Sequence, residues 1–320
     1  MLASGLLTTI AMLHLLLPLL LSSTTSVIGG TAVEPGRWRD AVAVLSATTA
    51  CTGTLITPDV VLTAGHCLDP EPVYVVIDTV DFRRTGGEAI RVKWSMAYPR
   101  WEDAYDVGVV VLDRPATTAP RAIAAACTVR ERLVEGAQAQ LVGFGLSATS
   151  GTDPSSQLHE GTISIADPAC NDPAACVPGV SPGGEFIAAA GGVDACFGDS
   201  GGPVYLDGPG GPALIGVVSR GLPVDGPPCG SGAVYVRADQ VVPWIEQVTQ
   251  ETVQRTTCIE DVAPGVPVVA AAPEPGGCAA GSGAGGSLVI GLGALAAAGR
   301  HRRRARAQSG AATIGILGAR

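Results

Sequence analysis

The chain has 320 residues, enough for one all-β domain of roughly 200–250 residues with additional segments at its ends. Hydrophobic residues make up 47% of it and charged residues 15%, which excludes a disordered chain and supplies material for a large core. Its 43 glycines and 24 prolines follow no collagen period, so turn-rich β structure is favoured. The net charge is −9, and residues 27–258 carry 14 basic and 26 acidic side chains; this acidic body argues against nucleic acid as a partner.

The first 26 residues have the pattern of a secretory signal peptide. An apolar run, Leu6–Leu21, is followed by the small polar residues Ser22–Ser26. The run is too short and too early for an ordinary membrane-spanning helix of about 20 residues. Lys and Arg, usual before such a run, are missing, so an uncleaved membrane anchor is the alternative. Export is favoured, because nine cysteines are typical of an oxidising compartment.

Short β-branched runs separated by Gly and Pro turns predict strands throughout residues 27–250. The clearest runs are Ala41–Leu45, Val60–Leu62, Val73–Ile77, Val107–Leu112 and Leu214–Val218. A closing helix is expected at about Ala238–Val248. These elements indicate an all-β domain that ends in one helix.

Only two of the four histidines lie within this domain, His66 and His159. His159 stands in a polar stretch and is expected to be solvated. His66 follows an apolar strand and precedes Cys67, an expected disulfide cysteine, so its ring is held in place. A fixed neutral imidazole is what a general base needs.

Two further blocks combine polar residues with apolar or glycine-rich surroundings. Asp106 precedes a run of five apolar residues and a glycine, so its carboxylate is expected to be partly buried and hydrogen-bonded. Such a group either orients an imidazole or is an ordinary aspartate at a strand end. Ser200 lies in the sequence Gly-Asp-Ser-Gly-Gly-Pro, where glycines allow backbone N–H groups to converge. The N–H groups of Gly198 and Ser200 are the expected oxyanion hole.

These blocks, in the order His, Asp and Ser, resemble the trypsin/chymotrypsin-like serine protease family over about residues 27–250. The resemblance implies two six-stranded antiparallel β-barrels with the active site between them. No cofactor is expected, and the lack of a C-x-x-C motif or a His/Cys cluster in the sequence argues against a metal. The resemblance makes Ser200 the nucleophile, His66 the general base and then acid, and Asp106 the orienting carboxylate. Ser219 matches the family's buried serine that hydrogen-bonds the triad aspartate.

The resemblance also implies a substrate preference. Asp194 matches the residue at the base of the primary pocket, where a carboxylate is satisfied by Arg or Lys of a protein or peptide substrate. Gly221 matches a glycine that lines this pocket, and Ala233 takes the place of a second one unless the alignment shifts to Gly232. The extra methyl would narrow the pocket, so chymotrypsin- or elastase-like specificity is an alternative. Arg220 replaces a large aromatic residue, which predicts a preference for acidic residues next to the scissile one.

Activation is implied by the sequence Val-Ile-Gly-Gly-Thr that begins at Val27. In the family a freed amino terminus of this kind pairs with the aspartate before the nucleophile, here Asp199. Thr24 and Ser26 are small residues suited to signal peptidase, so we expect signal removal itself to generate Val27. Trimming of a short pro-segment, Ser22–Ser26, by another protease is the alternative.

Nine cysteines in an exported chain indicate four disulfides and one odd cysteine. Two pairs match the family, Cys51–Cys67 and Cys196–Cys229. Cys170–Cys176 and Cys127–Cys258 are the expected pairs among the other four cysteines, whose pairing is open. The odd one is then Cys278.

The C-terminal part has a different composition. Residues 259–277 are a Pro/Ala/Gly linker, and residues 278–306 contain Cys278, a short apolar segment and an arginine cluster. This order resembles the C-terminal sorting signals of myxobacterial surface proteins and implies membrane anchoring at the cell surface. Residues 307–320 extend beyond such signals and stay unassigned, and a low-complexity tail is the alternative.

The sequence thus predicts an exported, monomeric serine endopeptidase, secreted or surface-anchored, that acts through an acyl-enzyme and cleaves after Arg or Lys. A catalytically inactive binding protein on the same scaffold is the alternative from another class. Activity is favoured because all three triad positions are occupied.

Overall fold

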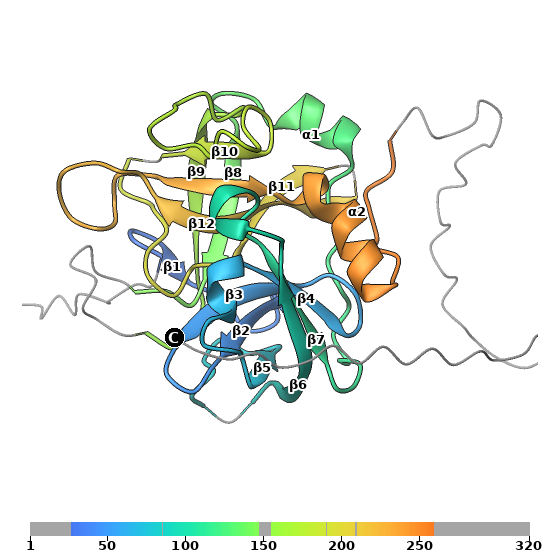
Figure 1. The fold of residues 1–320 in the computed structure, drawn as a ribbon. Coiled ribbons are helices and arrows are strands. Elements are labelled where there is room, and N and C mark those ends of the chain that lie inside the picture. The colour runs from blue at the N-terminus through green and yellow to red at the C-terminus, as the bar shows by residue number, and fades with distance from the viewer. Residues whose placement is uncertain (1–26, 85, 147–154, 190, 209, 259–320) are drawn as a thin grey trace, which may run out of the picture. The chain divides into compact units, whose positions relative to one another are not determined.

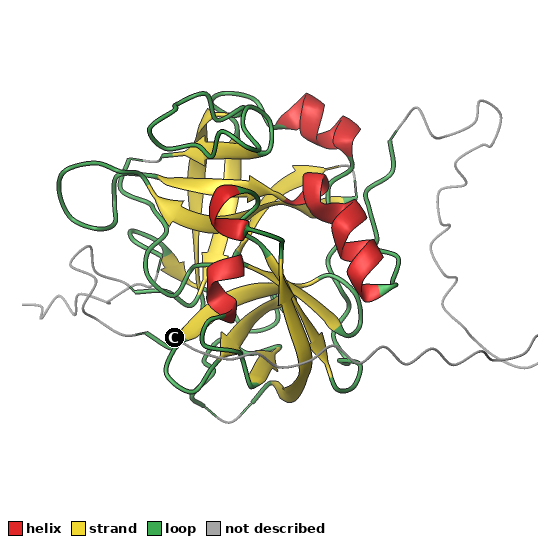
Figure 2. Ribbon diagram, in the orientation of Figure 1, coloured by secondary structure: helices red, strands yellow, loops and turns green. Residues whose placement is uncertain are grey.

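The computed structural model describes residues 27–258 except 85, 147–154, 190 and 209 (Figure 1). The predicted signal peptide, the linker, Cys278 and the remaining tail lie outside the described residues. Strands predominate over helices in the described part (Figure 2). Within that part, no helix is both long and apolar enough to cross a bilayer.

The first six strands after β1 close into an antiparallel barrel in the order β2-β3-β4-β7-β6-β5. They are β2 (Ala41–Leu45), β3 (Ala50–Leu55), β4 (Val60–Thr63), β5 (Tyr74–Ile77), β6 (Glu88–Ala97) and β7 (Gly108–Leu112). The predicted strand at 41–45 coincides with β2, and the other predicted strands differ from the observed ones at their ends. Buried Val, Ile and Leu side chains fill the barrel, as β-branched residues suit a pleated, half-buried surface.

The later strands form a second six-stranded barrel, in the order β8-β9-β10-β13-β12-β11, which β11 closes by pairing with β8. They are β8 (Gln138–Gly143), β9 (His159–Asp167), β10 (Glu185–Ala188), β11 (Pro203–Gly208), β12 (Gly211–Gly221) and β13 (Ala233–Arg237). The short β1 (Thr31–Ala32) is added at β9. Inside, Phe186 stacks on Tyr235 with ring centroids 5.1 Å apart.

Helices occupy the connections and the end of the domain. Two are α-helices, α1 (Ala126–Arg132) and α2 (Ala238–Thr249), and two are 3-10 turns, η1 (Gly65–Leu68) and η2 (Trp101–Asp103). Helix α2 buries Val241, Val242 and Ile245 against the body and ends one residue beyond the predicted helix. The prediction of two six-stranded barrels followed by a helix is confirmed.

A buried aromatic and charged cluster joins segments of both barrels. Trp38 stacks on Tyr205 of β11, with centroids 4.6 Å apart and an interplanar angle of 7°. The Arg121 guanidinium lies over both rings and binds the Asp40 carboxylate, which also accepts a 2.7 Å hydrogen bond from the Tyr205 hydroxyl. The charged and hydroxyl groups of this cluster are paired with one another. The cluster therefore holds the two barrels together without leaving an unpaired buried charge.

Candidate active site

One pocket of about 440 Å³ is lined by residues of both barrels. His66 and Asp106 come from the first barrel, and Ser200 comes from the loop before β11 of the second. The remaining lining residues are Trp101, Ala195, Cys196, Phe197, Val218, Ser219, Arg220, Gly221, Pro228 and Cys229. The three residues with the chemistry of a catalytic triad therefore share a single pocket.

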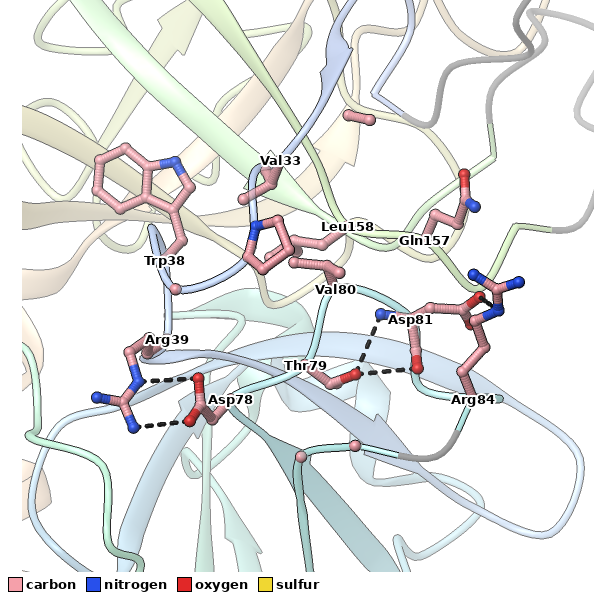
Figure 3. A pocket seen from close by; sticks show the side chains of 15 residues that line it. Val33, Trp38, Arg39, Asp78, Thr79, Val80, Asp81, Arg84, Gln157 and Leu158 are labelled. Carbon is pink, nitrogen blue, oxygen red and sulfur yellow. Dashed lines mark hydrogen bonds and ion pairs between the residues drawn. The ribbon is translucent and has the colours of Figure 1, made fainter.

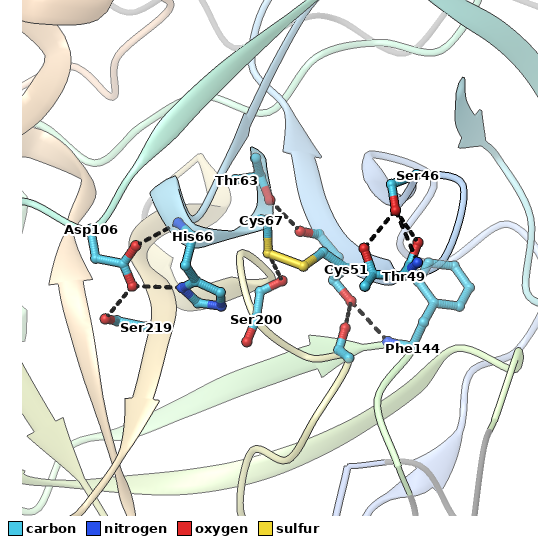
Figure 4. The surroundings of a disulfide bond; sticks show 12 residues. Ser46, Thr49, Cys51, Thr63, His66, Cys67, Asp106, Phe144, Ser200 and Ser219 are labelled. Carbon is cyan, nitrogen blue, oxygen red and sulfur yellow. Dashed lines mark hydrogen bonds and ion pairs between the residues drawn. A yellow bond between two sulfur atoms is a disulfide. The ribbon is translucent and has the colours of Figure 1, made fainter. Parts of the chain in front are cut away.

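His66 is held by its backbone and by its ring (Figure 4). It lies in η1, directly after β4, and the Cys51–Cys67 disulfide ties this turn to β3. Its backbone N–H donates to Oδ1 of Asp106 at 3.0 Å, and its ring Nδ1 lies 2.9 Å from Oδ2. An ionised carboxylate only accepts hydrogen bonds, so the ring proton is assigned to Nδ1 and Nε2 is left as the basic nitrogen.

Asp106 is 7% exposed and precedes β7. Burial alone raises the pKa of this carboxyl group. The hydrogen bonds and charge of His66, together with the Ser219 hydroxyl that donates to Oδ2 at 2.7 Å, outweigh that effect and lower the pKa below its ordinary value. The carboxylate is therefore ionised at neutral pH and stabilises a protonated imidazole.

The loop that carries Ser200 is fixed from the first barrel by Thr52 of β3. The Thr52 backbone N–H donates to the Ser200 carbonyl at 2.9 Å, and its hydroxyl donates to the Gly198 carbonyl at 2.7 Å. Among the described residues, the backbone N–H groups of Gly198 and Ser200 donate to no protein acceptor. In that same part of the chain no hydrogen bond joins the side chains of Ser200 and His66; such bonds are often long before substrate binds.

Asp199, next to the nucleophile candidate, is fully buried. Its carboxylate accepts hydrogen bonds from the backbone N–H groups of Gly145, at 2.8 Å, and Cys196, at 2.9 Å. No salt bridge of the described residues reaches it. Burial raises the pKa of this group to about 7. Val27, the predicted new amino terminus, is also fully buried.

Asp194 is 2% exposed and does not line the 440 Å³ pocket itself. Its carboxylate accepts hydrogen bonds from the backbone N–H groups of Ala195 (2.8 Å), Gly230 (2.7 Å) and Gly232 (2.9 Å). Burial raises its pKa, and these donors oppose the rise. The carboxylate thus holds the turn at residues 230–232.

Two other predicted pocket residues lie near Asp194 in the second barrel. Gly221 lines the pocket at the end of β12, and Ala233 is buried where β13 begins, paired with Gly221 across the strands. The buried hydroxyl of Tyr235 has no hydrogen-bond partner in the described part of the chain. Burial raises the pKa of this phenol, and the charges of Asp194 and Asp199 raise it further.

Arg220 forms contacts that the sequence did not reveal. Its guanidinium binds Glu185 of β10, with Nη1 2.7 Å from Oε1, and Nη2 donates to the Ala175 carbonyl at 2.7 Å. The arginine side chain is 33% exposed, whereas that of Glu185 is 0% exposed. The charge of Arg220 is therefore paired within the protein, and no pattern in the sequence linked these two positions.

His159 is buried, so the prediction that it is solvated was wrong. It is 2% exposed and lies in β9 between Ala32 of β1 and Gly143 of β8. Burial lowers the pKa of its ring, although its Nδ1 lies 3.2 Å from the Gln157 carbonyl. The polar residues around His159 hid this strand in the sequence, and its burial depends on pairing with β8, which precedes it, and with the distant β1.

The described residues contain two groups of side chains with metal-ligand chemistry and suitable spacing. Each includes a disulfide pair, Cys51–Cys67 with His66 in one and Cys170–Cys176 with Glu185 in the other. A cysteine binds a metal as its thiolate, and the disulfides leave no thiolate in either group. The other two disulfides join Cys127 to Cys258 and Cys196 to Cys229.

A second pocket, of about 390 Å³, lies apart from the triad candidates between residues 32–39 and the loop at 78–87 (Figure 3). Arg39 binds both oxygens of Asp78, at 2.8 and 2.6 Å, and Asp81 lies 3.7 Å from Arg84. Glu88, where this loop ends, is paired with Arg114. The acidic side chains of this loop are thus neutralised by arginines.

The sequence profile of the trypsin family matches residues 27–245. Over 257 residues the chain is 28% identical to the serine proteinase stubble of Drosophila melanogaster, an alignment that covers 71% of this chain but 32% of that protein. It is 30% identical to a trypsin of Saccharopolyspora erythraea (58% of this chain, 81% of that protein) and 31% identical to a trypsin of Simulium vittatum (54% and 70%). With this match across both barrels, the chain belongs to the trypsin family of serine proteases.

Proposed function

We propose that the protein is an active serine endopeptidase in which Ser200 is the nucleophile, His66 the general base and Asp106 its orienting group. The observation that carries this proposal is the double engagement of Asp106, which accepts from His66 and from Ser219 while His66 and Ser200 line one pocket. This arrangement fixes the imidazole and leaves Nε2 as the base toward the nucleophile.

The proposed reaction proceeds in two halves. Ser200 Oγ attacks the scissile carbonyl carbon while His66 Nε2 takes the hydroxyl proton, and the tetrahedral oxyanion accepts hydrogen bonds from the N–H groups of Gly198 and Ser200. His66 returns the proton to the leaving amine, which leaves an acyl-enzyme on Ser200. Water, deprotonated by His66, then attacks the ester and releases the acid product and the serine.

The proposed substrates are proteins or peptides with Arg or Lys at the cleaved position. Asp194 supports this, because a buried carboxylate near the pocket gains most from a cationic side chain. This carboxylate already accepts hydrogen bonds from three backbone N–H groups, and it would bind the cationic side chain of the substrate in addition to them. With Ala233 adding a methyl, cleavage after Phe or Ala is the competing specificity.

The test uses matched peptides that differ only at the scissile residue, Arg, Lys, Phe or Ala, with Ser200→Ala and Asp194→Asn as variants. Cleavage after Arg and Lys that vanishes in Ser200→Ala supports the nucleophile. A further loss of at least about a hundredfold in kcat/KM in Asp194→Asn, restricted to the cationic peptides, supports the pocket. Cleavage after Phe or Ala would reject the Arg/Lys preference, and a folded protein that cleaves nothing would favour a binding role.

We also propose that export and activation are one event. Removal of the signal peptide after Ser26 would free the amino group of Val27, which would pair with the buried Asp199 carboxylate. The absence of a salt bridge to Asp199 among the described residues and its raised pKa support a need for such a cation. N-terminal sequencing of the purified, active protein should begin at Val27; any other start would reject this route.

For location, we propose that the protein is exported, acts as a monomer, and is tethered through its tail at Cys278. The support lies in the four disulfides and in the sequence pattern of residues 278–306. Cell fractionation of the protein and of a Cys278→Ser variant tests it. Release of the variant into the medium is expected, and equal retention of both proteins would reject a role for Cys278.

A further inference from the structure

A continuous line of hydrogen bonds extends from Asp106 through Ser219 and Arg220 of β12 to Glu185 of β10, the next strand but one in the second barrel. The Ser219 hydroxyl donates to Asp106 Oδ2 at 2.7 Å and accepts from Arg220 Nη1 at 3.1 Å. The same Nη1 donates to Glu185 Oε1 at 2.7 Å. A hydroxyl has one proton and two lone pairs, so Ser219 serves both neighbours without conflict.

The far end of this line is built into the fold. Glu185 is 0% exposed, and its second oxygen accepts from the Val177 backbone N–H at 2.7 Å and the Ser181 hydroxyl at 3.1 Å. Arg220 is also bound by the Ala175 carbonyl through Nε and Nη2. A buried carboxylate with this many partners has a fixed position, and it fixes the guanidinium in turn.

The local backbone directs Ser219 toward Asp106. β12 pairs regularly with β13 up to Val218 and resumes at Arg220, so the register shifts at Ser219. Such a bulge changes the direction of a side chain, a common feature beside functional sites. The adjacent side chains of Ser219 and Arg220 are thereby able to contact each other and two different carboxylates.

We propose that Arg220 and Glu185 form a charged pair that positions and tunes the catalytic triad through Ser219. This inference rests on the proposed protease function. Arg220 increases the acidity of the Ser219 hydroxyl and so strengthens its bond to Asp106, and Glu185 balances the positive charge that would otherwise disfavour a protonated His66. Both are positioning residues, since neither touches the reacting atoms.

Other charged and titratable groups surround this line and stay constant in the test. Tyr105 precedes Asp106, burial raises the pKa of its phenol, and it interacts electrostatically with Glu185 and Tyr98. Arg237 and Asp239, at the junction of β13 and α2, bind each other at 2.7 Å and act on Tyr105 with opposite signs. Substituting Arg220 or Glu185 removes the charge of that residue and leaves the charges of Tyr105, Arg237 and Asp239 unchanged.

The experiment measures kcat/KM against pH for the purified protein and for Glu185→Gln, Arg220→Gln and the double variant. Glu185→Gln leaves a positive charge unbalanced, so the midpoint of the acid limb should fall by about half a pH unit. Arg220→Gln leaves a negative charge unbalanced and should raise that midpoint by about as much. The double variant should return close to the wild-type midpoint, and Arg220→Lys should stay near it.

The same titration can be followed without turnover, by NMR of labelled histidines in the Ser200→Ala background. His66 is assigned through a His66→Ala variant, and the buried His159 provides an internal reference. Arg39→Gln, which breaks an ion pair remote from the triad candidates, is the matched control and should shift neither measurement.

Opposite shifts in the two single variants support the proposal. Equal shifts, or none, would overturn it, as would a change confined to the preference for acidic residues next to the scissile one. The proposed function fails separately: if the wild-type protein cleaves nothing, the NMR titration still decides whether the pair acts on His66. If Glu185→Gln does not fold, Arg220→Gln and Arg220→Lys still distinguish charge from packing.

Discussion

Thr52, in the first barrel, donates a 2.7 Å hydrogen bond from its hydroxyl to the carbonyl of Gly198, in the loop of the second barrel that carries the nucleophile candidate. The same hydroxyl accepts from the Phe144 backbone N–H at 3.0 Å. One side chain thus fixes the peptide next to the proposed oxyanion hole from across the boundary between the barrels.

Thr52→Val keeps the shape of the side chain and removes this hydroxyl. The Gly198 carbonyl and the Phe144 N–H then lose a buried partner, so we expect a loss of about 2 kcal/mol in the free energy of unfolding and roughly tenfold in kcat. Denaturant melts and steady-state kinetics measure both, with Thr52→Ser as the control that keeps the hydroxyl. Unchanged kcat in Thr52→Val would mean that the loop does not need this bond.

Gly201, directly after Ser200, should tolerate no side chain. It has φ +79°, and a Cβ here would lie 2.0 Å from Thr63 Oγ1 and 2.4 Å from the Thr52 carbonyl oxygen. We expect Gly201→Ala to lower the free energy of unfolding by more than about 3 kcal/mol or to prevent folding. Gly36→Ala is the matched control, with φ +87° and open space around its Cβ, and should cost about 1 kcal/mol. Similar losses in thermal melts of both variants would contradict this account.

The raised pKa of Asp199 predicts that stability depends on pH when the amino group of Val27 is blocked by a fused domain. Its folded pKa of about 7 lies above the ordinary 3.8, so between about pH 4 and pH 7 the folded state binds a proton that the unfolded state does not. Protonated Asp199 therefore contributes a few kcal/mol to the free energy of unfolding below about pH 4. This contribution decreases as the pH rises and is lost once the pH has passed through 7. Chemical denaturation from pH 5 to pH 8 should show this slope in the fused chain and not in its Asp199→Asn variant. A slope that survives the substitution would assign it to another group.

The ion pairs of the loop at residues 78–88 predict that stability and activity do not depend on divalent cations. Asp78, Asp81 and Glu88 each pair with an arginine, respectively Arg39, Arg84 and Arg114. We expect a chelator or added calcium to leave Tm and kcat/KM unchanged, and Asp78→Asn to cost less than about 1 kcal/mol, because its pair is largely exposed. A calcium-dependent rise in Tm that disappears in Asp78→Asn would show that these carboxylates do bind the ion.

Local signals in the sequence allowed the strands, the closing helix and the polar blocks of the site to be predicted, and the resemblance of those blocks to the protease family implied the two barrels. The apolar run at 41–45 coincides with β2, and the blocks around His66, Asp106 and Ser200 stand at strand ends that meet in one pocket. What escaped prediction depends on pairing between distant segments. Glu185 lies 35 residues from Arg220, and His159 is buried in a strand flanked by β1 and β8. No local pattern encodes such contacts.

The bond between Cys127 and Cys258 joins positions 131 residues apart, and Cys258 is the last residue that the structure describes. If the segment that follows fastens the enzyme to a surface, a pulling force on it enters the fold at Cys258. The disulfide to α1 then shares this load with the hydrogen bonds between residues 254–256 and residues 123–125. Helix α2 and β13, which precede Cys258, are then shielded from the load. The proposed pocket beside β12 and β13 would then keep its shape while the chain is held from its C-terminal side.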